Sequence, residues 1–324
     1  MVFWKTYPLS TWIRTLFPSS PFHDVRFEKE PMESPTGYPA EQVDISYRTD
    51  IRMFLKAYFG NPPSTPILDI PETELLPKKD SLFFVKDSTR AIAGCIRYHF
   101  LGSFQDQSMY VVDCFCIHPS WRKRGVGDYL LTILHDFVNK NNIPYCLFLK
   151  EGPSLSILSF PIYSSRYVVR CLEIVQPSTH PHVHSLSIHQ AHRAIDLFQE
   201  CNPSLFIVRN RENMSNQIWK IYRRGMYTII ACIQDTYQWF VQDNEKKRMG
   251  WITCWIESPG IPSSVQEEAS IAIADSVGES FDYLWTNEEW TGDSKQWMID
   301  GYFHWYSYQW STSIRIQNQY CIVH

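Results

Sequence analysis

The strongest constraint on the fold is a strand, a basic glycine-containing loop and a helix that follow one another directly. Residues 109–117, M-Y-V-V-D-C-F-C-I, form an apolar, β-branched run with the length and composition of a buried strand. The sequence H-P-S-W-R-K-R-G-V-G follows, and apolar side chains then recur at helical spacing at Val126, Leu130, Leu131, Leu134 and Phe137. This order predicts an α/β unit whose loop lies at the start of the helix.

The predicted loop has the features of an anion-binding site. The first N–H groups of a helix lack partners inside the helix and lie at the positive end of its dipole, and glycine lets a phosphate approach them closely. Three consecutive cations add positive charge at the same point. The candidate anion-binding residues are Arg122, Lys123, Arg124, Gly125, Val126 and Gly127. The alternative interpretation is an ordinary helix start with a solvated basic turn.

Composition narrows the class of protein. Of the 324 residues, 44% are hydrophobic and 20% charged, which is enough for a large core in one or two domains. The net charge of −4 gives no general attraction to nucleic acid or anionic lipid, so any anion site has to be local. No apolar run reaches the ~18 residues that an integral membrane span requires, and the start lacks the apolar run of a signal peptide. We therefore expect a cytoplasmic monomer without a nucleic-acid partner.

A metal site is not expected. The histidines between His180 and His192 lie in a connection rich in proline and serine, and they lack the helical or C-x-x-C spacing that fixes metal ligands. The nine scattered cysteines are expected to be reduced and unpaired.

Three regions are predicted along the chain. Residues 1–45 contain six prolines and little periodicity, which indicates an extended arm on a folded body. The motif F-V-x-D with a downstream G-x-I begins at Phe84 and again at Phe240, 156 residues later, and a helix and an aromatic-rich strand follow each copy. Unless this repetition is due to chance, it indicates a duplicated α/β unit. We predict a first half at 46–175, which carries the basic loop, and a second half at 176–324.

The loop resembles the coenzyme A-binding motif of the GNAT acyltransferase superfamily, Q/R-x-x-G-x-G/A, which Arg122, Gly125 and Gly127 match. The resemblance implies that the loop holds the diphosphate of an acyl-CoA. It also implies that the strand ending at Ile117, itself a candidate coenzyme-binding residue, splays from its neighbour so that free backbone amides hold the thioester carbonyl. Donors aimed at a developing oxyanion can each lower the barrier by about 3 kcal/mol.

Nearly the whole chain resembles the N-myristoyltransferases, in which two GNAT-like halves are fused. V-F-W-K-T-Y-P-L near the start is similar to the arm that wraps the acyl-CoA in that family, which implies coenzyme-binding roles for Phe3 and Trp4. V-D-C-F-C-I-H, residues 112–118, resembles the strand whose amides form the oxyanion hole, which implies that catalytic role for the backbone of Cys114 and Phe115. S-F-D-Y-L-W-T-N-E-E-W and G-Y-F-H-W-Y-S-Y-Q-W resemble the family's last helix and strand region. The implied fold is α/β (α+β) with a saddle-shaped mixed sheet flanked by helices.

The same resemblance implies a catalytic base and a reaction. The family uses the free carboxylate of its last residue to take the proton from the substrate amine, which implies this role for the α-carboxylate of His324. A carboxylate can act in this way when it is desolvated beside the ammonium that it deprotonates. The alternative is an ordinary final strand or end of the chain. The implied activity is transfer of myristoyl from myristoyl-CoA to the N-terminal glycine amine of a protein, without a covalent enzyme intermediate or a metal.

Departures from that family leave other activities open. Gly125 and Gly127 stand where the family carries arginine and alanine, and Asp113 stands where it carries asparagine. The segment 146–152 has no hydroxyl where an active-site threonine is expected. The alternatives are a GNAT acetyltransferase that uses acetyl-CoA on a protein or small-molecule amine, and a non-catalytic protein that binds acyl-CoA. The acyl length and the acceptor therefore stay open.

Overall fold

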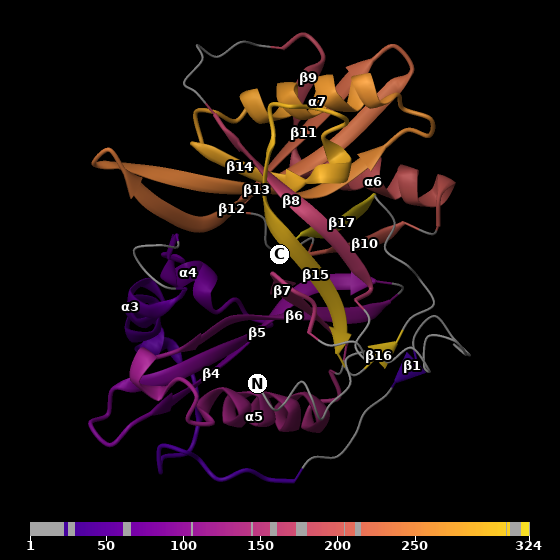
Figure 1. Cartoon of the computed structure of the whole chain (residues 1–324). Helices are drawn as coiled ribbons and strands as arrows, with labels where there is room; N and C mark the ends of the chain where they lie inside the picture. The colour runs from indigo at the N-terminus through magenta and orange to yellow at the C-terminus, as the bar shows by residue number, and fades with distance from the viewer. Residues whose placement is uncertain are drawn as a thin grey trace.

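The computed structural model contains one large mixed sheet with helices packed against it (Figure 1). The residues that it describes are 23–24, 30–60, 66–104, 106–143, 145–155, 161–172, 180–203, 205–210, 215–308, 310–311 and 319–323. The helices are α3 (Arg48–Tyr58), α4 (Glu72–Leu75), α5 (Val126–Lys140), α6 (Ile188–Cys201) and α7 (Ser263–Asp275), with short 3-10 helices η1 (Ile45–Tyr47), η2 (Pro119–Trp121) and η3 (Glu288–Trp290). The strands of the first half are β1 (His23–Asp24), β2 (Glu41–Gln42), β3 (Ile67–Leu68), β4 (Ser81–Lys86), β5 (Ile92–Phe104), β6 (Gln107–Ile117), β7 (Cys146–Glu151) and β8 (Tyr163–Cys171). Those that follow are β9 (Val183–Leu186), β10 (Phe206–Arg209), β11 (Gln217–Arg224), β12 (Tyr227–Gln242), β13 (Glu245–Glu257), β14 (Tyr283–Asn287), β15 (Met298–Tyr308), β16 (Trp310–Ser311) and β17 (Tyr320–Val323).

The chain repeats one topology. In the first half β4, β5 and β6 pair in antiparallel order, and α5 then crosses to β7, which is parallel to β6. In the second half β11, β12 and β13 pair in the same way, and α7 crosses to β14, which is parallel to β13. Two units of the same kind are therefore present, as the sequence predicted.

The sequence alignment of the two units, however, was wrong by one strand. The offset of 156 residues matched the hairpin β4–β5 with the hairpin β12–β13, whereas β12–β13 takes the place of β5–β6. The pairing also differs, because Gly94 lies opposite Val85 but Gly250 lies opposite Asp235. The repeated motif thus marks two hairpins of similar composition, which do not occupy equivalent positions in the two units.

The two halves share the sheet. Its strand order is β14-β8-β15-β7-β6-β5-β10-β17-β13-β12-β11-β9, and β14 also pairs with β13, so the path from β14 to β13 closes on itself. β15 comes from the end of the sequence, yet it lies between β7 and β8 of the first half (Figure 1). The domain boundary predicted between residues 175 and 176 stays a prediction, because the sheet contains strands from both sides of that point. Within the predicted arm at residues 1–45, the short strand β1 pairs with β16.

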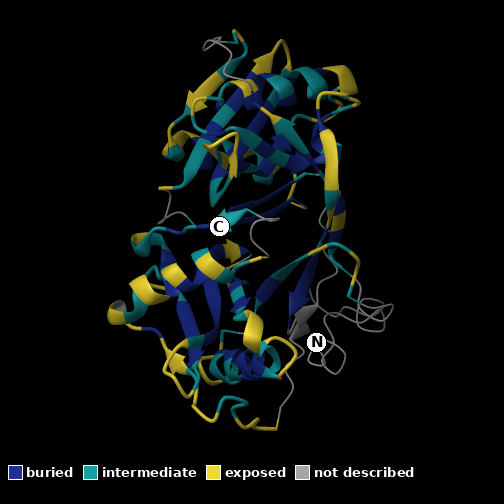
Figure 2. Ribbon diagram, turned by 60° about the vertical axis from the view of Figure 1, so that its left-hand side comes forward, coloured by how far each residue is buried: buried dark blue, intermediate teal, exposed yellow. Residues whose placement is uncertain are grey.

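The position of β6 between two layers fixes the surroundings of the candidate site. Buried residues fill both sides of the sheet in each half (Figure 2). Along β6, Cys114 and Cys116 pack with buried residues of α3, while Phe115 and Ile117 pack on the cluster that holds the buried face of α5. Gly60 follows α3 in a left-handed conformation with φ of 77°, as is common at the end of a helix. In the described part of the chain, no helix is long and apolar enough to cross a membrane.

Candidate active site

β6 and β7 separate at the point where the resemblance to GNAT proteins predicts it. The two parallel strands pair only from Tyr110 opposite Cys146 to Val112 opposite Phe148. Beyond Phe148, β7 continues as a partner of β15, while β6 continues as a partner of β5. From Cys114 onward β6 therefore has no β7 residue paired with it, and the place where the two strands part is called the gap below.

The backbone of β6 is irregular inside this gap. Cys114 is left-handed, with φ of 46°, and the register of the β5–β6 ladder shifts opposite it, between Cys95 and Arg97. A non-glycine residue in this conformation is uncommon, and bulges of this kind redirect backbone groups at sites near the end of a strand. The Cys95 thiol donates to the carbonyl oxygen of Cys114 at 3.4 Å, which fixes the direction of that carbonyl.

The side chain of Cys114 is not a nucleophile here. It is buried against the α3 side of the sheet, and this burial raises the pKa of its thiol well above the usual value. The pKa of the Cys116 thiol is raised to about 12 by the same cause, although the Arg122 charge opposes the shift. The groups of β6 that can interact with a reacting group are therefore those of its main chain.

Two glycines let the strand, the helix and their neighbours approach closely. A Cβ atom on Gly127, in the first turn of α5, would lie 3.1 Å from Cζ of Phe115. A Cβ atom on Gly94 of β5 would lie 2.7 Å from Cδ1 of Ile117 and 3.1 Å from Cδ1 of Leu130. The start of α5 therefore rests directly on the end of β6, which brings the two predicted groups of site residues together.

The loop between β6 and α5 has the backbone of an anion-binding turn. After the 3-10 helix η2, Lys123 and Gly125 are left-handed, with φ of 63° and 86°. A turn with left-handed residues can direct successive N–H groups toward one side, and the first turn of α5 adds its own. Lys123 and Arg124 are exposed, whereas Val126 is fully buried and packs into the core of the first half.

Arg122 has main-chain partners that the sequence did not predict. Its Nε donates to the carbonyl of Ile117 at 3.2 Å, and its Nη2 donates to the carbonyls of Tyr58 and Gly60 at 3.3 and 3.1 Å. Arg122 thus ties the end of α3 to the end of β6. Its predicted contact with a diphosphate stays a prediction, and Arg122, Lys123 and Arg124 are all exposed at the turn.

Part of the predicted arm, from Met32 to Ala40, lies beside this turn. A Cβ atom on Gly125 would be 3.4 Å from Cγ of Pro35 and 3.6 Å from Cε of Met32, and the N–H of Ala40 donates to the Tyr129 hydroxyl at 3.0 Å. Phe3, Trp4 and His324 lie outside the described residues, so their predicted roles remain predictions. The four residues before His324 form β17, which is buried between β10 and β13.

A buried ionic cluster beside the irregular part of β6 was missed by the sequence analysis. Arg97 Nε and Nη2 bind the two carboxylate oxygens of Asp113 at 2.6 and 2.5 Å, and Nη1 donates to the carbonyls of Glu74 and Leu75. Asp80 lies 3.9 Å from Arg97 Nη1. The available signals were an arginine in β5 and an aspartate inside the apolar run of β6, since a buried charge requires a partner.

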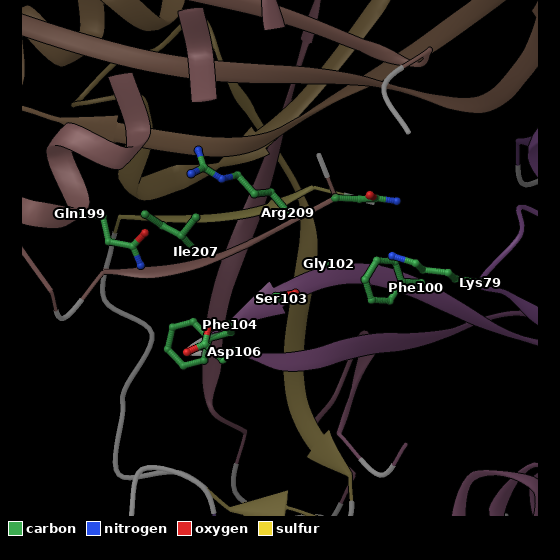
Figure 3. Close-up of a pocket in the computed structure, with 10 residues that line it drawn as sticks. Lys79, Phe100, Gly102, Ser103, Phe104, Asp106, Gln199, Ile207 and Arg209 are labelled. Carbon is green, nitrogen blue, oxygen red and sulfur yellow. The ribbon is translucent and has the colours of Figure 1, made fainter. Parts of the chain in front are cut away.

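A cavity lies away from the loop, where the two halves meet (Figure 3). It has a volume of about 410 Å³ and is lined by β5 residues, including Phe100 and Phe104, and by Ile207, Arg209 and Asn210 at the end of β10. A second cavity of about 230 Å³ adjoins it and shares Phe100 and Asn210. These cavities lie where the edge of β5 passes from β4 to β10.

Comparison with known proteins defines the class of fold. Residues 49–155, which span α3 to the end of β7, match the model of the acetyltransferase (GNAT) family. Comparison with curated protein sequences finds no match. The first half therefore has the features of a GNAT unit, in agreement with the separated strands β6 and β7 and with the loop before α5.

The whole chain has the architecture of the N-myristoyltransferases. A structure of N-myristoyltransferase from Saccharomyces cerevisiae with bound myristoyl-CoA matches with a TM-score of 0.69 and 12% identity, over 100% of this chain and 99% of that chain. A second structure of the same yeast enzyme with myristoyl-CoA gives a TM-score of 0.68 and 12% identity, over 99% and 94%. The predicted fold class, a mixed-sheet α/β tandem of GNAT-like units, is confirmed.

Proposed function

We propose that this chain is an acyl-CoA-dependent N-acyltransferase. The observation that carries the proposal is the combination of three features at one place: the separation of β6 from β7, the left-handed Cys114 inside the gap, and the basic turn that begins α5. A diphosphate at the turn would leave the thioester end of an acyl-CoA to enter the gap, where main-chain groups of β6 are near.

The reaction in this proposal is a direct transfer. The N–H groups of Cys114 and Phe115 hold the thioester oxygen, and an uncharged amine attacks the carbonyl carbon to form a tetrahedral intermediate. The C–S bond then breaks, coenzyme A leaves as a thiol after taking a proton, and the amine nitrogen loses one. Binding and orientation of the two reactants supply much of the rate increase in a reaction of this kind, together with donors fixed for the oxyanion.

For the finer assignment we propose myristoyl as the acyl group and the N-terminal glycine of a protein as the acceptor. The match of nearly the whole chain to yeast N-myristoyltransferase structures supports this choice. A shorter acyl group is the second candidate, because the family model that matches residues 49–155 is described as an acetyltransferase. Both candidates use the same turn and the same gap.

A competition experiment tests the proposal. The protein is incubated with equal concentrations of acetyl-CoA and myristoyl-CoA and a glycine-ended peptide, with the same peptide blocked at its N-terminus as a control, and products are identified by mass spectrometry. Myristoylation of the free peptide alone is the expected result. Preference for acetyl-CoA would replace the finer assignment with the acetyltransferase, and binding of acyl-CoA without any product would contradict transferase activity.

We further propose that the α-carboxylate of His324 accepts the proton of the amine. Support comes from β17, whose buried position brings the chain into the middle of the sheet directly before His324. The test compares two variants: one glycine added after His324, which moves the carboxylate, and His324→Ala, which keeps it. Loss of turnover in the extended protein together with activity in His324→Ala is expected, and normal turnover of the extended protein would exclude this base.

A further inference from the structure

The residue before the candidate oxyanion site carries a negative charge. Asp113 directly precedes Cys114 on β6, and its side chain is only 25% exposed. A carboxylate at this place repels an oxyanion that forms on the neighbouring amides, and the repulsion is strong because nearby burial reduces screening by water. A catalytic gap with an uncompensated Asp113 would therefore be poorly suited to acyl transfer.

Arg97 supplies the compensation in a fixed geometry. Its guanidinium binds both carboxylate oxygens of Asp113 in the bidentate manner that arginine favours, at 2.6 and 2.5 Å. The Arg97 side chain is 8% exposed. The pair also borders the register shift in the β5–β6 ladder, because Arg97 lies directly opposite Asp113 where the shift ends.

A second set of contacts holds Arg97 itself in place. Its Nη1 donates to the carbonyls of Glu74 and Leu75 in α4, at 3.0 and 3.2 Å. Asp80, whose side chain is 1% exposed, lies 3.9 Å away and is held in turn by His99 Nδ1 at 2.5 Å. Since the guanidinium is fixed on both sides, it cannot move away from Asp113 without the loss of several buried contacts.

We propose that Arg97 is a positioning residue for acyl transfer: it neutralises Asp113 and holds the left-handed turn at Cys114 so that the β6 amides meet the thioester oxygen. This inference rests on the proposed function. It explains how the gap tolerates aspartate where the N-myristoyltransferases, by resemblance, carry asparagine. The proposal also predicts that removal of Arg97 lowers acyl transfer mainly because the charge of Asp113 is then no longer neutralised.

Four variants test the proposal: Arg97→Met, Arg97→Lys, Asp113→Asn and the double variant Arg97→Met with Asp113→Asn. We expect Arg97→Met to lower kcat about 100-fold, a loss of the size seen when one oxyanion donor is removed, while the Kd of acyl-CoA stays within about threefold. Arg97→Lys keeps the charge but loses the bidentate geometry, so its loss is intermediate. The double variant recovers kcat to within about tenfold of the wild type, because the uncompensated charge is gone.

A spectroscopic measurement separates this proposal from the proposed function. Infrared difference spectra of acyl-CoA labelled with carbon-13 at the thioester carbonyl report polarisation of that bond without turnover. The bound carbonyl band is expected at lower frequency than in free acyl-CoA for the wild type, near the free value for Arg97→Met, and lowered again for the double variant. Arg170→Met is the matched control, because it removes a partly buried pair with Asp275 far from the gap and should leave the band unchanged.

The outcomes are distinct. A lowered carbonyl band that depends on Arg97, without turnover of any acceptor, supports the positioning role and contradicts the transferase. Turnover by the wild type with no rescue in the double variant, or with an unchanged band in Arg97→Met, overturns the positioning role and leaves the transferase standing. Failure of the wild type to bind acyl-CoA overturns both.

Discussion

Gly125 shows how a single residue shapes the candidate anion site. Its φ of 86° places it in the left-handed region directly before α5, where any side chain adds strain. We predict that Gly125→Ala lowers the free energy of unfolding by about 1–2 kcal/mol and weakens acyl-CoA binding, because relief of the strain rotates the N–H groups of the turn. Urea unfolding and calorimetric titration with acyl-CoA measure the two effects.

Gly225→Ala is the matched control for this prediction. Gly225 is also left-handed, at φ of 59°, and a Cβ atom there would have no neighbour within 4 Å. It lies between β11 and β12 in the other half. A similar loss of stability with unchanged acyl-CoA affinity is expected, and equal affinity in Gly125→Ala would mean that the turn does not contact the coenzyme.

The thiol of Cys116 makes stability depend on alkaline pH. Burial raises its pKa in the folded protein from 9.0 to about 12, so the unfolded chain releases this proton at lower pH than the folded chain does. The stabilisation by the protonated thiol is therefore fully present below pH 9 and is lost as the pH rises toward 12, by about 1.4 kcal/mol per pH unit. We predict that the stability difference between wild type and Cys116→Ala shrinks by about 1 kcal/mol between pH 9 and pH 10, as measured by urea unfolding.

The comparison of wild type with Cys116→Ala over the same pH range tests the alkaline effect. Parallel curves for wild type and Cys116→Ala across the same range would show that the thiol ionises without unfolding.

At the level of single residues, the sequence predicted the loop better than its surroundings. Arg122, Gly125 and Gly127 were recognisable because a short linear motif carries their chemistry. The partners of Arg122 at the end of α3 and the pairing of Arg97 with Asp113 were not, because these contacts join residues 16 to 64 positions apart. Nothing in a local pattern specifies which strand position lies opposite another.

Among the elements, α5 connects the core of the first half to the candidate site. Leu130 is fully buried, and it packs close to Gly94 of β5. We predict that Leu130→Ala lowers the free energy of unfolding by about 2–4 kcal/mol through the lost burial and the cavity left behind. Because the first turn of α5 rests on this contact, acyl-CoA affinity should fall as well.

A substitution of the same type on an exposed helix face is the control for α5. Leu197 of α6 is 56% exposed, so Leu197→Ala is expected to change stability by less than about 0.5 kcal/mol. Thermal unfolding of the two variants, together with acyl-CoA titration, compares them. A stability loss in Leu130→Ala without any loss of affinity would indicate that the turn keeps its shape independently of the core.

Local elements were predictable because their signals are local. The hairpin β4–β5 and the helix α5 follow from apolar periodicity and turn residues within about 20 positions. The duplicated unit was recognised, but its alignment was wrong, because F-V-x-D describes any charged hairpin turn of this composition. The equivalent positions are identified by the order of the strands around α5 and α7. That order depends on which strands pair with one another and not on the local sequence.

At the scale of the whole molecule, the sheet that unites the halves was beyond the sequence. β10 and β17 lie between β5 and β13, and β15 lies between β7 and β8, so the closed path depends on pairings across more than 100 residues. These strands are short or apolar, and their composition fits several positions in a sheet equally well. The general architecture came instead from resemblance, and the comparison with yeast N-myristoyltransferase structures confirmed it.

One glycine makes the junction of the two halves possible, and it offers a test of their coupling. Gly102 of β5 has φ of 128°, and a Cβ atom there would lie 1.9 Å from the carbonyl oxygen of Arg209 in β10. Backbone atoms cannot move aside cheaply, so we predict that Gly102→Ala separates β5 from β10 and costs about 3 kcal/mol or more. Because the contact joins β5 of the first unit to β10 of the second, the variant should also lose cooperativity between them.

Hydrogen exchange followed by mass spectrometry measures this coupling directly. In the wild type, amides of β5–β6 and of β12–β13 should become exchangeable together as urea is added, whereas in Gly102→Ala the two regions should open at different urea concentrations. Gly260→Ala is the control, since Gly260 is left-handed at φ of 74° and a Cβ atom there meets nothing within 4 Å. If Gly102→Ala unfolds in one step at the wild-type urea concentration, the β5–β10 contact does not couple the halves, and the closed sheet must be held together through β15 and β14 instead.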